Sequence, residues 1–508
     1  MRTLHEAAGT VEVYSPAEER FNRRRRTAGL MAAPALFFLL LWLLPGTLAP
    51  SARRLGAILG AMIVLWITEA LPLAVTALLG PVLAILLGVA PAREVFAPFA
   101  DPIIFLFIGS FILAEGMFRH GLDRRVAYTA LASRLLRRGG AVRLVLVYAG
   151  VTGAISMWIS NTATTAMMYP IGLAIVAHLA GERMAQVEAR RFAAVMMLAT
   201  SFAASIGGMA TPVGTPPNLI GLAMLERLAG VRLSFVEWMM LGVPLAGGLI
   251  ALLVAWFALA ALRGVTLVAD GRERMAEELA RLGPLGPGER NVLVAFGVTV
   301  ALWLVPGVFA IAGAADSPAA QAYAAAVPEA VAALIGAILL FVLPVNWRAR
   351  RFTLSWSEAA GIDWGIILLF GGGLAMGELA FDTGLARALG DAVTAWLPDR
   401  GSVALTVAFT ALAIVLSETA SNTASANVVV PVAIAVAQAA GVDPLRPALG
   451  ATLGASMGFM MPISTPPNAI VYSSGYVPIT TMIRYGVVLD VMGFVLIVGM
   501  LLLVPGLG

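Results

Sequence analysis

Two polar strings of identical composition, Ser160-Asn161-Thr162 and Ser421-Asn422-Thr423, interrupt sequence that is otherwise apolar. Each string offers a hydroxyl, an amide and a second hydroxyl in a row, and these groups can coordinate a small cation or hold an oxyanion. In hydrocarbon, a polar group without a partner costs several kcal/mol. A polar string that occurs twice at membrane depth therefore predicts a bound ligand.

Each string is followed by a second motif, Gly214-Thr215-Pro216-Pro217-Asn218 after the first and Ser464-Thr465-Pro466-Pro467-Asn468 after the second. Paired prolines remove backbone donors and block helix continuation, so each motif predicts an unwound break inside a membrane helix. Such a break is tolerated at membrane depth only where it is buried in protein or lines a water-filled cavity.

The composition predicts a polytopic membrane protein. The chain has 508 residues, of which 60% are hydrophobic and only 12% charged, whereas soluble domains carry roughly a quarter charged residues. The absence of cysteine excludes disulfides, thiolate metal sites and cysteine nucleophiles. All 33 basic residues are arginines, and they cluster at the ends of predicted helices. They therefore indicate membrane orientation rather than nucleic-acid binding.

The first half reads as a set of membrane helices between two charged segments. Four consecutive arginines, Arg23 to Arg26, end a polar N-terminal stretch and place it on the cytoplasmic side. We expect a cytoplasmic tail at 1–27, scaffold helices and the start of repeat 1 at 28–118, a first transport unit at 119–262, and a cytoplasmic linker at 263–290.

Within the first transport unit, residues 144–181 are too long for one span and have arginines near both ends. We interpret them as a re-entrant hairpin that enters and leaves on the cytoplasmic side, with the first polar string at its tip. The alternative is two full spans joined by a very short loop. The broken helix that follows is expected at 192–226.

The second half repeats the first. Phe370, Glu378 and Gly384-Leu385 match Phe107, Glu115 and Gly121-Leu122 at a constant offset of 263 residues. We expect scaffold helices and the start of repeat 2 at 291–400 and a second transport unit at 401–508. That unit would contain an outside hairpin at 401–440 and a broken helix at 446–476.

Counting crossings gives the two halves opposite orientations. The prediction is an all-α inverted repeat with about eleven transmembrane helices, two re-entrant hairpins and two broken helices. It would lie in the cell inner (plasma) membrane, with a cytoplasmic N-terminus and the C-terminus outside. Interrupted helices at matching positions of an inverted repeat are typical of a secondary transporter with a site at the membrane midplane.

The duplicated Ser-Asn-Thr strings, each followed by Thr-Pro-Pro-Asn, resemble the divalent anion/sodium symporters, the INDY-like dicarboxylate and citrate transporters. The resemblance covers nearly the whole chain after residue 28. It implies a homodimer in which a scaffold domain holds a mobile transport domain. It also implies an elevator movement that carries a di- or tricarboxylate of the succinate, malate or fumarate class together with Na⁺.

The resemblance also implies a site. The substrate-binding residues would be Ser160, Asn161, Thr162, Ser421, Asn422, Thr423, Thr465 and Pro466. The first Na⁺ site would use Ser156, Ser160, Asn161 and Gly214. The second would use Ser417, Ala420, Asn422 and Ser464. Two positions depart from some relatives, Ser417 where threonine can stand and Ser464 where alanine can, and neither change removes a required oxygen.

The residues give independent support for ion coupling. No arginine or histidine lies inside either motif cluster, so other groups must hold an anion. Helix N-termini offer free N–H groups and roughly half a positive charge each, and bound Na⁺ would supply the rest. Na⁺ coupling is thus an electrostatic expectation.

Several alternatives remain open at this point. In the same fold, a Na⁺-independent dicarboxylate exchanger or a sulfate-type anion transporter would share these motifs, and a passive channel could also be duplicated. We expect no enzyme, because the sequence offers no nucleophile–base pair and no cluster of metal-binding histidines. Glu418 could couple protons or hold backbone, and we favour the structural role. Glu115 and Glu378 are interpreted as helix-end or packing residues, and Gly371-Gly372-Gly373 as a close helix contact.

Overall fold

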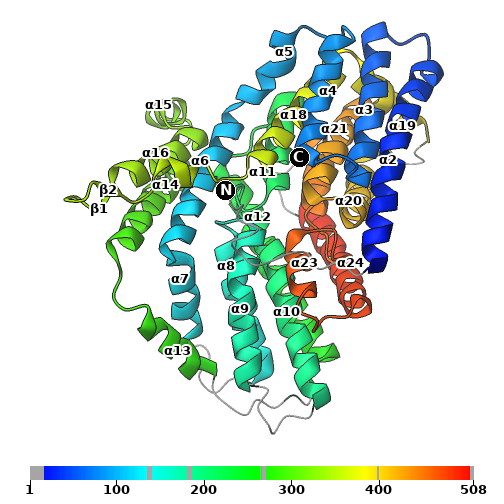
Figure 1. Ribbon diagram of the computed structural model, residues 1–508. Helices are drawn as coiled ribbons and strands as arrows, with labels where there is room; N and C mark the ends of the chain where they lie inside the picture. Colours follow the sequence, from blue (N-terminus) through cyan, green and yellow to red (C-terminus); the bar gives the residue numbers. More distant parts are fainter. Residues whose placement is uncertain are drawn as a thin grey trace.

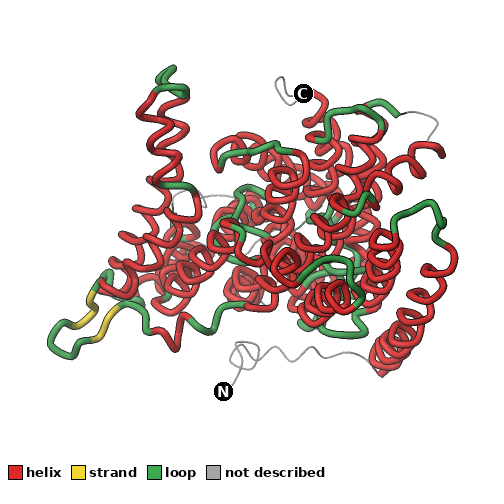
Figure 2. Tube along the Cα trace, turned by 90° about the horizontal axis from the view of Figure 1, so that it is seen from above, coloured by secondary structure: helices red, strands yellow, loops and turns green. Residues whose placement is uncertain are grey.

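The computed structural model describes residues 16–133, 140–179, 186–263, 265, 271–396 and 400–503. Parts of the predicted N-terminal tail, of the linker at 263–290 and of the end of the first hairpin lie outside these residues, as do 397–399 and 504–508. The described chain is almost entirely helical (Figures 1 and 2). The short strands β1 (Pro344–Asn346) and β2 (Arg351–Phe352) form an antiparallel pair that projects from one side in Figure 2.

The helices follow the predicted duplication. In the first half they are α2 (Pro16–Leu43), α3 (Pro50–Thr68), α4 (Leu73–Leu86), α5 (Ala92–Phe96), the 3-10 helix η1 (Ala97–Ala100), α6 (Pro102–His120), α7 (Leu122–Leu131), α8 (Ala141–Ser156), α9 (Asn161–Leu179), α10 (Gln186–Gly208), α11 (Pro216–Ala229), α12 (Phe235–Ala260) and α13 (Gly271–Arg281). In the second half they are α14 (Pro287–Ile311), α15 (Pro318–Ala326), α16 (Glu329–Val342), α17 (Trp356–Ala359), α18 (Trp364–Asp382), α19 (Leu385–Trp396), α20 (Ser402–Thr419), α21 (Asn422–Ala439), α22 (Leu445–Gly454), α23 (Pro466–Tyr472) and α24 (Ile479–Leu503).

Ten described helices are long and apolar enough to cross a membrane, and the number rises to eleven if the bent pair α15 and α16 counts as one span. The series from α6 to α12 has the same order of elements as the series from α18 to α24. Each series has a long helix, a short helix, a helical hairpin, a broken helix and a final long helix. The prediction of an all-α polytopic membrane protein with an internal repeat is confirmed.

The beginnings of the helices that frame the site have local causes. Asp101 caps α6, because its Oδ1 accepts a hydrogen bond from the backbone N–H of Ile103 at 2.8 Å. Ser234 and Glu237 form a capping box at the start of α12. Pro216 and Pro466 stand at the first positions of α11 and α23, where the missing N–H has no helical partner to lose.

Close helix contacts explain the glycine run of α18. A Cβ atom on Gly372 would lie 2.2 Å from the carbonyl oxygen of Ala77 on α4, and one on Gly373 would fall on the side chain of Asn427 on α21. Only glycine permits this approach. The predicted role of Gly371-Gly372-Gly373 in close packing is confirmed.

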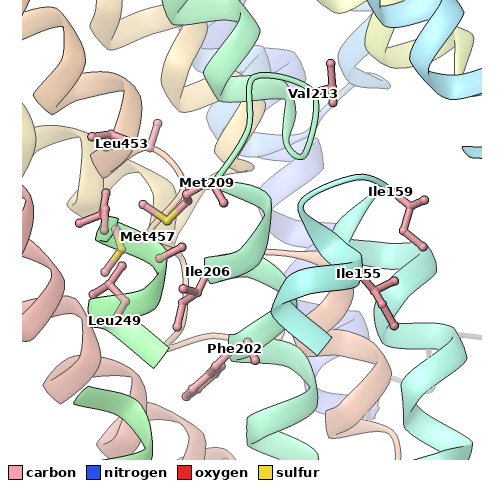
Figure 3. Packing of buried hydrophobic residues seen from close by; sticks show 14 of the residues in the cluster. Ile155, Ile159, Phe202, Ile206, Met209, Val213, Leu249, Leu453 and Met457 are labelled. Carbon is pink, nitrogen blue, oxygen red and sulfur yellow. The ribbon is translucent and has the colours of Figure 1, made fainter. Parts of the chain in front are cut away.

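The interior is shared between the two repeats. Phe202 on α10 and Phe459 after α22 meet edge to face, with ring centroids 5.1 Å apart. Figure 3 shows Ile206 and Met209 from the first repeat beside Leu453 and Met457 from the second. Burial of apolar surface at this seam holds the two broken helices against each other.

Four features were not foreseen from the sequence. The short helices α7 and α19 follow α6 and α18 after a turn at Gly121 or Gly384, each with positive φ. The helix α15 bends by 56° into α16, and the strand pair follows α16. These pieces are short and their burial depends on neighbouring elements, so hydrophobic periodicity carries little signal for them.

We predict a pH-dependent effect of Asp123 on stability. Asp123 lies in α7, outside the ten candidate spans, and is 1% exposed. Burial raises the pKa of its carboxyl group to about 6. Because the folded pKa is raised above the unfolded value, ionisation makes folding less favourable as pH rises from about 4 to 6.

Asp123→Asn is therefore expected to stabilise the protein by about 3 kcal/mol at pH 8 and by about half that at pH 5. Thermal unfolding of the purified protein at both pH values measures the difference. An equal effect at the two pH values would contradict the prediction.

Candidate functional site

The first polar string connects α8 to α9 at the tip of a helical hairpin. Ser156 ends α8, and its hydroxyl donates a hydrogen bond to Oδ1 of Asn161, the first residue of α9, at 2.8 Å. The Ser160 hydroxyl accepts from the backbone N–H of Ala163 at 3.2 Å. The Thr211 hydroxyl donates to the carbonyl oxygen of Met157. The hairpin tip is thereby bound to the break between α10 and α11.

One side-chain amide stabilises the unwound backbone of that break. The buried side chain of Asn218 on α11 donates from Nδ2 to the carbonyl oxygens of Gly208, at 2.9 Å, and Thr211, at 2.7 Å. These bonds satisfy two carbonyl groups that the interrupted helix leaves without helical partners. The absence of a side chain at Gly208 leaves room for Asn161, because a Cβ atom there would lie 2.3 Å from Oδ1 of Asn161.

The second string repeats this arrangement. The Ser417 hydroxyl lies 2.7 Å from Oδ1 of Asn422 and 2.7 Å from the carbonyl oxygen of Ala455. The Asn468 amide donates to the carbonyl oxygens of Gly458 and Met461, both at 3.0 Å. A Cβ atom on Gly458 would lie 2.8 Å from Oδ1 of Asn422. The two sites thus use equivalent residues for equivalent bonds.

The two sites are also bound to each other. The hydroxyl of Ser201, on α10, donates to Oδ1 of Asn468, on α23. A Cβ atom on Gly221 of α11 would overlap the side chain of Thr452 on α22. Each broken helix therefore packs its first half against the second half of the other.

The sites differ at Glu418. In the first break the N–H groups of Met209 and Ala210 bond to Ile206 and Gly207 at 3.1 and 3.0 Å, continuing the turns of α10. The helix α22 ends at Gly454, one turn before the equivalent of Gly208.

The extra unwound turn frees two backbone donors, and Glu418 accepts both. Its Oε1 lies 2.5 and 2.8 Å from the nitrogens of Phe459 and Met460, and its Oε2 lies 2.9 Å from the Ser464 hydroxyl. Glu418 thus bonds the backbone of the break rather than that of its own hairpin. These bonds favour the structural interpretation of Glu418.

The predicted site residues lie in two clusters. Ser156, Ser160, Asn161 and Gly214 belong to the first, and Ser417, Ala420, Asn422 and Ser464 to the second. The side chains of Ser160 and Pro466 are exposed, and those of Asn161, Thr162, Ser421 and Thr423 are partly exposed. The Thr465 hydroxyl is buried and has no hydrogen-bond partner within the described residues. Ion and substrate binding by these residues stays a prediction.

Sequence reasoning missed several residues of the site. Thr211, Gly208 and Gly458 lie in or beside the breaks, and their roles depend on which hairpin tip packs against them. Asp490, a lone acid in α24, is 6% exposed and lies against Glu418. A buried acid in an apolar span is a signal that could have been used.

Helical hairpins and broken helices at matching positions of a duplicated, all-helical bundle define a secondary transporter. The sequence matches the family described as "Sodium:sulfate symporter transmembrane region" over residues 25–504. The chain therefore belongs to this family.

Among curated relatives, the sodium-dependent dicarboxylate transporter SdcS of Staphylococcus saprophyticus is 31% identical over 478 residues, covering 92% of this chain and 89% of that protein. The protein of the same name from Staphylococcus aureus is 32% identical over 476 residues, with the same coverage. The crystal structure of the YdaH transporter of Alcanivorax borkumensis aligns with a TM-score of 0.52, covering 80% of this chain and 85% of that one. At 16% identity it indicates a shared fold alone.

Proposed function

We propose that this protein is a Na⁺-coupled symporter of small di- or tricarboxylates, of the succinate, malate and fumarate class. The observation that carries the proposal is the pair of equivalent oxygen-rich clusters at the hairpin tips, together with the names of the relatives. Hydroxyl, amide and carbonyl oxygens are ligands suited to a hard monovalent cation. Neither cluster contains a basic side chain, so cations bound there would balance a dianion.

The proposed division of roles follows exposure. Ser156 and Gly214 in the first cluster, and Ser417, Ala420 and Ser464 in the second, are buried and would coordinate Na⁺ behind the tips. The more exposed residues of the two strings would bind carboxylates between the tips, with Thr465 and Pro466. The helices α9 and α21 begin at the strings, so their N-terminal N–H groups would add favourable electrostatic potential.

The proposal includes an elevator movement within a homodimer in the cell inner (plasma) membrane. The units at 119–262 and 401–508 would move together, because their broken helices interlock through Ser201 and Asn468. The helices at 28–118 and 291–400 would form the scaffold. The arginine distribution supports a cytoplasmic N-terminus and an outside C-terminus.

Uptake of radiolabelled succinate into proteoliposomes tests the function. We expect empty vesicles to accumulate succinate only with an inward Na⁺ gradient. Uptake that requires preloaded succinate and ignores Na⁺ would instead identify an exchanger. Uptake that needs neither Na⁺ nor preloaded succinate, and that preloading does not stimulate, would identify a channel. Radiolabelled sulfate, measured in parallel, tests the substrate that the family description carries.

A further inference from the structure

Arg227 connects three segments that are distant in sequence. It lies in the last turn of α11. Its Nε is 2.6 Å from Oδ2 of Asp101, the capping residue of α6, and 3.6 Å from Oε1 of Glu378 on α18. The side chain of Asp101 is 5% exposed, whereas those of Arg227 and Glu378 are 42% and 26% exposed. Solvent is therefore largely excluded from Asp101, whereas it reaches parts of Arg227 and Glu378.

The cluster joins the two parts that the elevator proposal separates. Arg227 belongs to the first transport unit and extends the broken helix that begins at Thr215 and Pro216. Asp101 and Glu378 are on α6 and α18, the equivalent helices of the two repeats, which Phe107 and Phe370 hold together with ring centroids 5.4 Å apart. The guanidinium group of Arg227 thus contacts one proposed scaffold helix from each repeat.

Aromatic side chains form another part of the boundary between the proposed transport unit and the scaffold. Trp158, at the first hairpin tip, meets Phe296 of α14 with centroids 5.2 Å apart, and Phe235 of α12 stacks on Trp303 of α14 at 4.3 Å. Ring contacts are less directional than charge-assisted hydrogen bonds, so they can be exchanged as surfaces slide. The ion cluster cannot slide in this way, because its bonds either form or break.

Without Arg227, Asp101 and Glu378 would be two acids close to each other. Asp101 would keep its bond to Ile103 but would lose the cation that compensates its burial. A buried charge without its partner is strongly unfavourable. A movement of α11 away from α6 and α18 must therefore break the ion pair or carry a cost at Asp101.

We propose that the cluster of Arg227, Asp101 and Glu378 is an ionic latch that stabilises the arrangement of transport unit and scaffold seen here, and that its opening is a required step of transport. The inference rests on the elevator part of the proposed function. It makes Arg227 a positioning residue that acts through α11, without contact to substrate.

A disulfide can report this arrangement. A Cβ atom on Gly307 of α14 would lie 3.5 Å from Cβ of Val236 on α12, which is within the range of disulfides, about 3.5–4.5 Å. The chain contains no cysteine, so Val236→Cys with Gly307→Cys introduces the only pair. The initial rate of oxidative cross-linking then measures how often the described arrangement is populated.

In this background, Arg227→Gln is expected to slow cross-linking by about threefold or more, as for the loss of a partly exposed ion pair. Arg227→Lys keeps a cation beside Asp101 and Glu378, so it should restore most of the rate. Arg387→Gln, which removes an exposed arginine of α19, is the matched control and should leave the rate unchanged. Folding is checked for each variant by size-exclusion chromatography.

Unchanged cross-linking in Arg227→Gln would overturn the latch. A folded Arg227→Lys variant whose rate is as low as that of the Gln variant would overturn it as well. Na⁺-dependent uptake is measured in the same vesicles before oxidation. Wild-type uptake without Na⁺ dependence would refute the proposed function, whereas normal Na⁺ dependence with unaltered cross-linking would refute the latch alone.

Discussion

Gly208→Ala is expected to lower Na⁺-dependent uptake by roughly ten- to a hundredfold while leaving the protein folded. The new methyl group would lie 2.3 Å from Oδ1 of Asn161. The atoms it meets are at the end of that side chain, so the amide must rotate away while the backbone can stay. One lost ligand or hydrogen bond to a charged group corresponds to about 1–3 kcal/mol, which sets the expected range.

The matched control is Gly150→Ala in α8. No atom lies within 4 Å of a Cβ atom there, and alanine favours a helix over glycine. This variant should retain full uptake and equal or higher thermal stability. Substrate and Na⁺ dependence of initial rates should show the effect of Gly208→Ala as a raised half-saturating concentration. Normal kinetics in that variant would remove Asn161 from the site.

Much of this site could be predicted from the sequence, because the motifs combine strong local constraints with duplication. Two prolines after Thr215 or Thr465 determine where a helix begins, whatever packs around it. A polar string between apolar segments must have partners in a membrane. The string, the break and their repetition were therefore readable without a structure.

The parts that could not be predicted depend on packing between distant segments. Nothing in the sequence states that Gly208 faces Asn161 or that Asn218 donates to the carbonyl of Gly208. The unequal lengths of the two breaks could not be seen in the sequence either. Gly208 and the Thr215-Pro216-Pro217 motif align with Gly458 and its motif at the same offset, whereas α22 ends a turn earlier than α10. Glu418 accepts hydrogen bonds from the two backbone N–H groups that this extra unwound turn leaves free, those of Phe459 and Met460. Its structural role can therefore be recognised only once these bonds are known.

The Glu115 and Glu378 pair shows the limit of arguing from equivalence. Their equivalent positions in the two repeats predict a helix-end or packing role for both. Glu115 lies 3.9 Å from Arg119 of its own helix, whereas Glu378 faces Arg227 of a different helix, α11. Equivalent residues of an inverted repeat meet different neighbours wherever the two halves differ in conformation, as the proposed elevator would require at the boundary of its moving part.

Oxidation of the Val236→Cys, Gly307→Cys variant is expected to reduce uptake to the level of empty vesicles, and reduction of the disulfide should restore it. The bond would join α12, which the proposed function assigns to the first transport unit, to α14, which it assigns to the scaffold. If these helices must slide past each other in every cycle, a single covalent link stops transport completely. Removing a Val side chain while adding a Cys side chain at Gly307 keeps the local volume similar, so the reduced variant should fold and transport.

Each single-cysteine variant is the control for oxidation itself and should keep its uptake under the same oxidant. The fraction of cross-linked protein, measured on gels after cleavage in the linker between α13 and α14, should equal the fraction of uptake that is lost. Full transport by fully cross-linked protein would mean that α12 and α14 move as one body. The ring contacts of Phe235 with Trp303 would then be static core packing. The boundary between mobile and fixed parts would have to lie elsewhere, and cross-linking of this pair would no longer report the opening of the latch at Arg227.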